Sequence, residues 1–161
     1  MKRRKPKRQD YDGVTEINCS SRGRTELGCL LSTFGMPDDL QYIRTPHGLF
    51  KTIEGYWHYL GSQYEGLRRM SGYQAHQWAQ ANPNQFTRMP TEKFNYYIEQ
   101  AVRYKIDHSA YLQHLLSVND LPFVYYHISK GVAAESYGYN FFIELLNKIS
   151  VEIKEKTPGP S

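Results

Sequence analysis

Residues 48–60 have the sequence GLFKTIEGYWHYL, in which apolar side chains recur at the spacing of one helical face. Thr52 stands where an N-cap belongs, so the pattern predicts a helix that begins directly after it. The side chains expected on the buried face of this helix stand at i, i+3, i+4 and i+7, and they are Ile53, Tyr56, Trp57 and Leu60.

Glu54 falls in the first turn of this predicted helix, roughly 100° away from the apolar face. Its carboxylate is expected near the positive end of the helix dipole, where negative charge is stabilised. Two interpretations of Glu54 are open on these grounds. It is either a solvated surface carboxylate that merely suits the dipole, or a functional carboxylate whose partners come from the rest of the chain.

The remaining sequence predicts a few short strands and several more helices. Strands are expected over residues 14–20, 41–44, 49–51 and 122–128, and residues 27–34 form a compact apolar stretch. Helices are expected over residues 65–80, 91–105, 108–116 and 141–149. Because strands and helices do not alternate strictly, this order favours a helix-rich α+β domain over a doubly wound parallel sheet.

With 161 residues the chain is long enough for one domain with a substantial core. We expect this domain over residues 13–151, between a disordered basic arm (residues 1–12) and a disordered tail (residues 152–161). Residues 2–8, KRRKPKR, hold six of the twenty basic groups, which leaves fourteen against sixteen acidic groups in the rest. Such an arm either binds the phosphates of DNA or RNA non-specifically or is simply a solvated tail.

Cysteine usage and apolar content exclude several classes of protein. Cys19 and Cys29 have no CxxC or Cys/His spacing, so neither a zinc site nor a disulfide scaffold is predicted, and a reducing cytoplasm is expected. No apolar run approaches the roughly 18 residues of a membrane span, and no apolar segment follows the basic start as in a secretory signal. We therefore expect no membrane partner.

Several common sites are also missing from the sequence. It has no glycine-rich phosphate loop, no nucleophile elbow and no HExxH motif. No spacing of histidine, cysteine and carboxylate resembles a metal-ligand set, so no metal and no other cofactor is expected. We interpret four of the histidines as solvent-exposed or core residues rather than ligands, and these are His76, His108, His114 and His127.

Five segments, taken in order, resemble the motifs of the NADAR superfamily, the YbiA-like proteins. Residues 26–34, ELGCLLSTF, resemble the motif YGCFSNF, and residues 48–60 resemble the next motif, in which a glutamate opens an aromatic-rich helix. The other three resemblances are AHQWAQ at residues 75–80, AVRYK with a Leu-rich continuation at 101–116, and GYNFFIELLNKI at 138–149. The ordered set covers about residues 14–150.

The resemblance implies a NADAR-like fold and a metal-independent N-glycosidase. Members of the superfamily cleave N-glycosidic bonds, either in riboflavin-biosynthesis intermediates or between ADP-ribose and guanine in nucleic acid. Breaking a ribosyl C1–N bond builds positive charge on the sugar, which a fixed carboxylate stabilises. The resemblance assigns this catalytic role to Glu54, and it implies that the substrate is a nucleotide or an ADP-ribosylated nucleic acid.

The candidate substrate-binding residues come from these motifs and from the strand that precedes them. Tyr56 or Trp57 is expected to stack on a base, although the helical pattern also fits Trp57 in the core. Asn18 and Ser20, at the end of the first strand, are candidates for hydrogen bonds to ribose. The first motif adds Gly28, Ser32 and Phe34.

Three cationic residues are further candidates. Arg22, Arg24 and Lys105 either hold a phosphate or a sugar hydroxyl of the substrate, or form ordinary surface salt bridges.

The sequence departs from the family motifs at three places. Thr33 stands where Asn is usual, Ala79 and Gln80 replace Gly-Arg, and the late Asp…Trp-Gly segment has no counterpart near residues 125–137. These departures motivate an alternative, a non-catalytic module that binds ADP-ribose or a nucleotide. A third interpretation is a nucleic-acid-associated accessory protein that acts through its basic arm.

Overall fold

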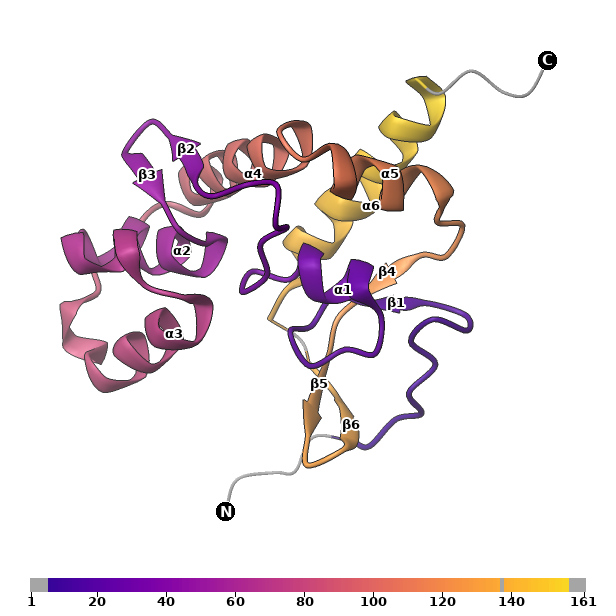
Figure 1. Ribbon diagram of the computed structural model, residues 1–161. Helices are drawn as coiled ribbons and strands as arrows, with labels where there is room; N and C mark the ends of the chain where they lie inside the picture. Colours follow the sequence, from indigo (N-terminus) through magenta and orange to yellow (C-terminus); the bar gives the residue numbers. More distant parts are fainter. Residues whose placement is uncertain (1–5, 137, 157–161) are drawn as a thin grey trace. The chain divides into compact units, whose positions relative to one another are not determined.

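Figure 1 shows the computed structural model, which describes residues 6–136 and 138–156. The described residues form six α-helices, two 3-10 helices and six short strands, which confirms the prediction of many helices with few strands. Contacts between residues divide the chain into two compact units, and the sequence did not predict this division. Unit 1 is made of residues 1–32 and 112–161, and unit 2 of residues 33–111.

Unit 2 contains a hairpin and three α-helices. β2 (Ile43–Thr45) pairs antiparallel with β3 (Gly48–Phe50), and the two strands overlap those expected over residues 41–44 and 49–51. The helices are α2 (Ile53–Ser62), α3 (Gly72–Ala81) and α4 (Thr91–Asp107), with 3-10 helices at Glu65–Arg69 and Pro83–Gln85 between them. Within this unit α2 packs against both α3 and α4 (Figure 1).

The start of α2 is fixed by the predicted N-cap. The hydroxyl of Thr52 accepts a hydrogen bond from the backbone N–H of Gly55, which satisfies a donor that the first turn leaves without a helical partner. The helix buries more than the predicted apolar face, because Glu54 and Tyr59 are buried with it, whereas Trp57 is only half-buried.

Unit 1 is assembled from two separate stretches of sequence. The first contains β1 (Ile17–Asn18) and α1 (Glu26–Leu31). The second contains most of α5 (Ala110–Val118), then β4 (Phe123–Val124), β5 (Tyr126–Ser129), β6 (Val132–Glu135) and α6 (Asn140–Lys156). β1 pairs in parallel with β4, so that the two stretches share a small sheet, and β5 and β6 form an antiparallel hairpin.

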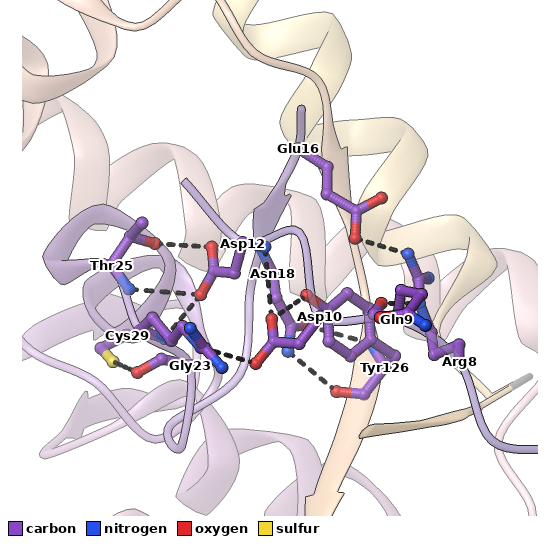
Figure 2. Close-up of polar contacts among 11 residues, drawn as sticks. Arg8, Gln9, Asp10, Asp12, Glu16, Asn18, Gly23, Thr25, Cys29 and Tyr126 are labelled. Carbon is purple, nitrogen blue, oxygen red and sulfur yellow. Dashed lines mark hydrogen bonds and ion pairs between the residues drawn. The ribbon is translucent and has the colours of Figure 1, made fainter. Parts of the chain in front are cut away.

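A polar cluster joins the two stretches of unit 1 (Figure 2). The side-chain amide of Asn18 donates to the carbonyl oxygen of Tyr126 at 3.1 Å and accepts from its backbone N–H at 3.0 Å. Asp12, which is 5% exposed, accepts from the backbone N–H groups of Asn18, Arg24 and Thr25. Because buried polar groups are stable only when they are hydrogen-bonded, these side chains hold the loop between β1 and α1.

Part of the predicted basic arm belongs to the fold. Residues 1–5 lie outside the described residues, whereas residues 6–8 form backbone hydrogen bonds to β6. Arg8 pairs with Glu16 at 2.5 Å, and its guanidinium lies 3.9 Å from the centroid of the Tyr126 ring. The prediction of a disordered arm is therefore corrected for residues 6–12: strand pairing and a cation–π contact hold residues 6–8, and Asp10 and Asp12 belong to the polar cluster of unit 1.

Other boundaries also differ from those expected: the strand over residues 14–20 is shorter, and the helix over residues 65–80 is divided into a 3-10 helix and α3. Residues 152–156, predicted as part of a disordered tail, continue α6 to Lys156, and residues 157–161 lie outside the described part of the chain. The apolar stretch at residues 27–34 overlaps the helix α1, which begins at Glu26 after its N-cap Thr25. No helix among the described residues is long and apolar enough to cross a membrane.

Candidate functional site

The carboxylate of Glu54 is buried inside unit 2, where only 2% of the residue is exposed. Its Oε2 accepts a hydrogen bond of 2.6 Å from the hydroxyl of Thr33, and its backbone N–H donates to the carbonyl oxygen of Thr33 at 2.9 Å. These two bonds tie the first turn of α2 to the segment before it. The interpretation of Glu54 as a solvated surface residue is therefore wrong.

Two histidines face the other oxygen of this carboxylate. Nε2 of His58, one turn further along α2, lies 2.9 Å from Oε1 of Glu54, and Nδ1 of His76 on α3 lies 3.6 Å from the same atom. One oxygen and two nitrogens of these three side chains all lie within 4.8 Å of one another. The side chain of His76 is 44% exposed, so the cluster is open to solvent on the side of α3.

The position of His76 depends on the close approach of α3 to the segment that follows Thr33. A Cβ on Gly72, the first residue of α3, would lie 2.6 Å from Cα and Cγ of Phe34, so only glycine fits there without movement. Ser71 caps α3 through a capping box, which fixes where the helix starts. His76 lies one turn after Gly72, so this packing sets the place of its imidazole beside Glu54.

Aromatic rings flank both histidines. The centroid of the Phe34 ring lies 5.8 Å from that of His76, and the centroid of Phe86 lies 5.9 Å from that of His58. Phe34 also lines a cavity of about 350 Å³, together with Lys51 and with the N-caps of α2 and α3. A cavity of this size can hold part of a nucleotide.

Tyr56, one of the two residues expected to stack on a base, is not accessible to a substrate. It is 0% exposed, and its ring packs against Phe50 at a centroid distance of 4.8 Å. Its hydroxyl lies 2.8 Å from Nδ1 of His47, and burial raises the pKa of Tyr56 to about 12. The assignment of Tyr56 as a stacking residue is corrected, because no face of the ring is free.

Two further candidates lie in unit 2. Trp57 is half-buried and packs edge-on against Phe94 at a centroid distance of 4.8 Å, so part of its ring is used in packing. Lys105 on α4 is 2% exposed, so it is not a surface salt-bridge residue. Lys105 is therefore an internal residue of this unit, where a buried ammonium group requires polar partners.

The candidates from the first strand, together with Gly28 and Ser32 of the first motif, lie in unit 1, and three of these have structural roles. Both polar ends of the Asn18 side chain are used by the backbone of Tyr126. A Cβ on Gly28 would lie 2.2 Å from the carbonyl oxygen of Asn18, so this glycine allows α1 to pack on β1. The hydroxyl of Ser32 donates to the carbonyl oxygen of Cys29 at 2.7 Å at the end of α1.

Three more candidates lie on the loop between β1 and α1. The hydroxyl of Ser20 accepts from the backbone N–H of Arg22 at 3.2 Å, and the side chain of Arg22 is exposed. Arg24 forms a surface ion pair with Asp10 at 2.9 Å, as one of its two interpretations expected. The structure thus places Phe34 and Glu54 together in unit 2, whereas these three loop residues belong to unit 1.

His58 and His76 are the residues of this site that the sequence interpretation missed. A signal for His58 was present, because its i, i+4 spacing from Glu54 places both side chains on one face of a helix. No comparable signal existed for His76, which reaches Glu54 only because α3 packs against α2. Together with Glu54 these two histidines form a group that could hold a metal ion, which the spacing of these residues in the sequence did not indicate.

A buried carboxylate between two imidazoles supports two kinds of chemistry. It can stabilise positive charge while the imidazoles transfer protons, and it can ligate a metal ion. Comparison of the chain with models of protein families, with curated proteins and with solved structures gives no match. The function has to be inferred from the site itself.

Proposed function

We propose that the protein is a divergent NADAR-type N-glycosidase that hydrolyses the C1–N bond of an ADP-ribosylated guanine in nucleic acid, or of a related ribosyl nucleotide. The observation that carries the proposal is the buried carboxylate of Glu54, with one oxygen held by Thr33 and the other facing His58 and His76. A fixed and buried negative charge stabilises cationic character on a sugar.

In the proposed reaction Glu54 acts mainly through its charge. As the C1–N bond lengthens, positive charge develops on the ribose and the carboxylate stabilises it. The oxygen of a water molecule forms the new bond to C1, while one of its protons passes to Glu54 or to the imidazole of His58. The base leaves with the electron pair of the broken bond and takes up a proton. No metal or cofactor takes part in this reaction.

The substrate is proposed to enter from the exposed side of His76, near the cavity of about 350 Å³ that Phe34 and Lys51 line. Lys51 is exposed and can pair with a phosphate of the nucleotide. A polymeric substrate gains further attraction from the four basic groups at residues 2–5. DNA or RNA contact through the arm therefore adds affinity without entering the chemistry.

The direct test is incubation of the protein with DNA that carries ADP-ribosyl-guanine, and separately with free nucleotides, with the products identified by mass spectrometry. Release of ADP-ribose and restoration of guanine support the proposal. Glu54→Gln serves as the matched control because it keeps the shape of the side chain and removes its charge. Equal product from both proteins contradicts the proposal.

A second candidate is a module that binds ADP-ribose or a nucleotide without turnover. The observation that favours it is Thr33, which stands where the family motif has Asn and which contacts Glu54 directly. In the same assay this module would retain ligand, detected by calorimetry, and release no product. Steeply salt-dependent DNA binding without any nucleotide binding would instead support the nucleic-acid-associated accessory protein.

A further inference from the structure

The cluster around Glu54 has a second chemical capacity, which does not depend on the proposed reaction. We propose that Glu54, His58 and His76 bind one divalent transition-metal ion of the Zn²⁺ class, through Oε1, Nε2 and Nδ1 respectively. Sequence spacing could not predict the site, because two ligands come from α2 and the third from α3.

The distances within the cluster suit a small ion. Zinc is bound at about 2.0–2.2 Å by imidazole nitrogen and carboxylate oxygen, so two ligand atoms of a tetrahedral site lie about 3.4 Å apart. Oε1 of Glu54 lies 2.9 Å from Nε2 of His58 and 3.6 Å from Nδ1 of His76, on either side of that value. The three ligand atoms lie within 4.8 Å of one another, and a small rotation of the half-exposed His76 closes them around an ion.

The types of ligand select the class of metal. Two imidazole nitrogens and one carboxylate oxygen, with a coordination position left for water, form the donor set of many catalytic zinc sites. Mg²⁺ and Ca²⁺ prefer sites made of oxygen ligands. Imidazole-containing sites favour the later first-row ions, among which Zn²⁺, Co²⁺ and Ni²⁺ fit this donor set.

The residues around the cluster orient these ligands. Thr33 holds Oε2 of Glu54 at 2.6 Å, so Oε1 is the oxygen that faces the histidines. Phe34 and Phe86 flank the two imidazoles and limit the directions in which the rings can turn. Hydrogen bonds to a ligating carboxylate and an apolar surrounding are typical supports of metal ligands.

Metal binding has one consequence that rests on the proposed function. A Zn²⁺ ion on Oε1 neutralises the charge of Glu54 and occupies the place where the ribose has to approach. If the protein is the proposed glycosidase, Zn²⁺ is therefore an inhibitor and not a cofactor. Metal binding itself requires no turnover.

The test uses the full chain without an affinity tag, freed of metal by chelation and dialysis. Co²⁺ is titrated into the protein, and the visible absorption of bound Co²⁺ reports on its coordination. Zn²⁺ is then added to displace it. We expect one Co²⁺ per chain, with the intense visible bands of a four- or five-coordinate site, and loss of these bands as Zn²⁺ binds.

Four variants locate the site. His76→Ala, His58→Ala and Glu54→Gln each remove one ligand and are expected to weaken Zn²⁺ binding by roughly 100-fold or more. His114→Ala is the matched control, because this histidine is exposed on α5 and lies outside the cluster. The Zn²⁺ affinity of this variant should equal that of the original protein. Circular dichroism of each variant checks the fold. We expect His76→Ala to fold, because the side chain that it removes is 44% exposed.

The outcomes separate this inference from the proposed function. Absence of Co²⁺ bands, or Zn²⁺ affinity that survives a folded His76→Ala variant, overturns the metal site. A protein that binds Zn²⁺ with the expected variant pattern but hydrolyses no nucleotide keeps the metal site and loses the proposed function. A glycosidase whose rate is unchanged by saturating Zn²⁺ overturns the site as well, because an ion on Oε1 has to block the carboxylate.

Discussion

The hydroxyl of Thr33 donates to Oε2 of Glu54 at 2.6 Å, and both residues are buried, at 6% and 2% exposure. Replacing Thr33 by Val keeps the shape of the side chain and leaves a buried carboxylate oxygen without its donor. We expect this change to lower the free energy of unfolding by about 1–3 kcal/mol, measured by urea denaturation. Thr33→Ser, which keeps the hydroxyl, should lose clearly less, and equal losses for both variants would contradict the role given to the hydrogen bond.

Glu54→Gln tests the charge of the carboxylate in the proposed reaction. Groups that stabilise developing charge are typically worth about 10²–10³ in rate, roughly 3–4 kcal/mol. We expect turnover to fall at least about 100-fold, while the melting temperature changes little, because Gln can still accept from Thr33 and is a good helix former. A variant that retains most of its activity in a confirmed hydrolysis assay removes Glu54 from the mechanism.

A chelator should not lower the rate of the proposed reaction. The carboxylate alone stabilises the ribosyl cation, and an ion bound to Glu54 opposes that stabilisation. Treatment with EDTA is therefore expected to leave turnover unchanged, or to raise it where the protein carries Zn²⁺ after purification. A large loss of activity that added metal restores would show that the reaction depends on the metal.

His47 gives unit 2 a dependence on pH. Burial, followed by the charges of Arg68 and Lys93, lowers the pKa of His47, and the hydroxyl of Tyr56 lies 2.8 Å from its Nδ1. Since the folded protein takes up this proton less readily than the unfolded chain, stability is full above about pH 6.5 and decreases as the pH falls below it.

Urea denaturation at about pH 7.5 and about pH 5.5 measures this effect, because the two values bracket the ordinary pKa of histidine. The protein with His47 should lose more stability on acidification than His47→Gln, whose amide oxygen can still accept from Tyr56. The same loss in both proteins would assign the pH dependence to other groups.

Two deletions of different length separate the charge of the basic arm from its contribution to stability. Removing residues 2–5 takes away four positive charges and should weaken binding to DNA, with a salt dependence flatter by about 0.9 for each lost phosphate contact. Removing residues 2–8 should also lower the melting temperature, because Arg8 pairs with Glu16 and stacks on Tyr126.

Turnover on a free nucleotide is the control for both deletions of the arm. It should be unchanged by the loss of residues 2–5, since these charges act only on a polymer. DNA affinity that does not respond to the shorter deletion would leave the arm as a solvated segment with no binding role.

Local signals in the sequence predicted the local parts of the fold. The N-cap Thr52 and the apolar spacing after it located the start of α2, and the strands expected over residues 41–44 and 49–51 correspond to β2 and β3. The parallel pairing of β1 with β4 was not predicted, because it joins residues far apart in sequence and neither strand is longer than two residues. Pairings of this kind leave no periodic signal in the sequence.

The candidate site was predicted only in part, because some of its residues meet through packing between helices and not through local spacing. Glu54 was identified from its place in a motif and in the first turn of a helix. His58 carried only the i, i+4 spacing, which is common on exposed helices, and His76 joined the site through the packing of Gly72 against Phe34. Tyr56 was misassigned because helical spacing shows which face is apolar and not whether a ring on that face is fully enclosed.

The link between Asn18 and Tyr126 spans 108 positions in the sequence, and this separation has a consequence for the synthesis of the protein. All the residues of unit 2 are synthesised before Phe123, the partner of Ile17, has been made. The β1 segment must then wait with its backbone unpaired and its apolar side chains exposed, which is the state in which nascent chains aggregate or recruit chaperones. A pause in translation between residues 33 and 122 therefore lengthens the period in which the first stretch of unit 1 has no partner.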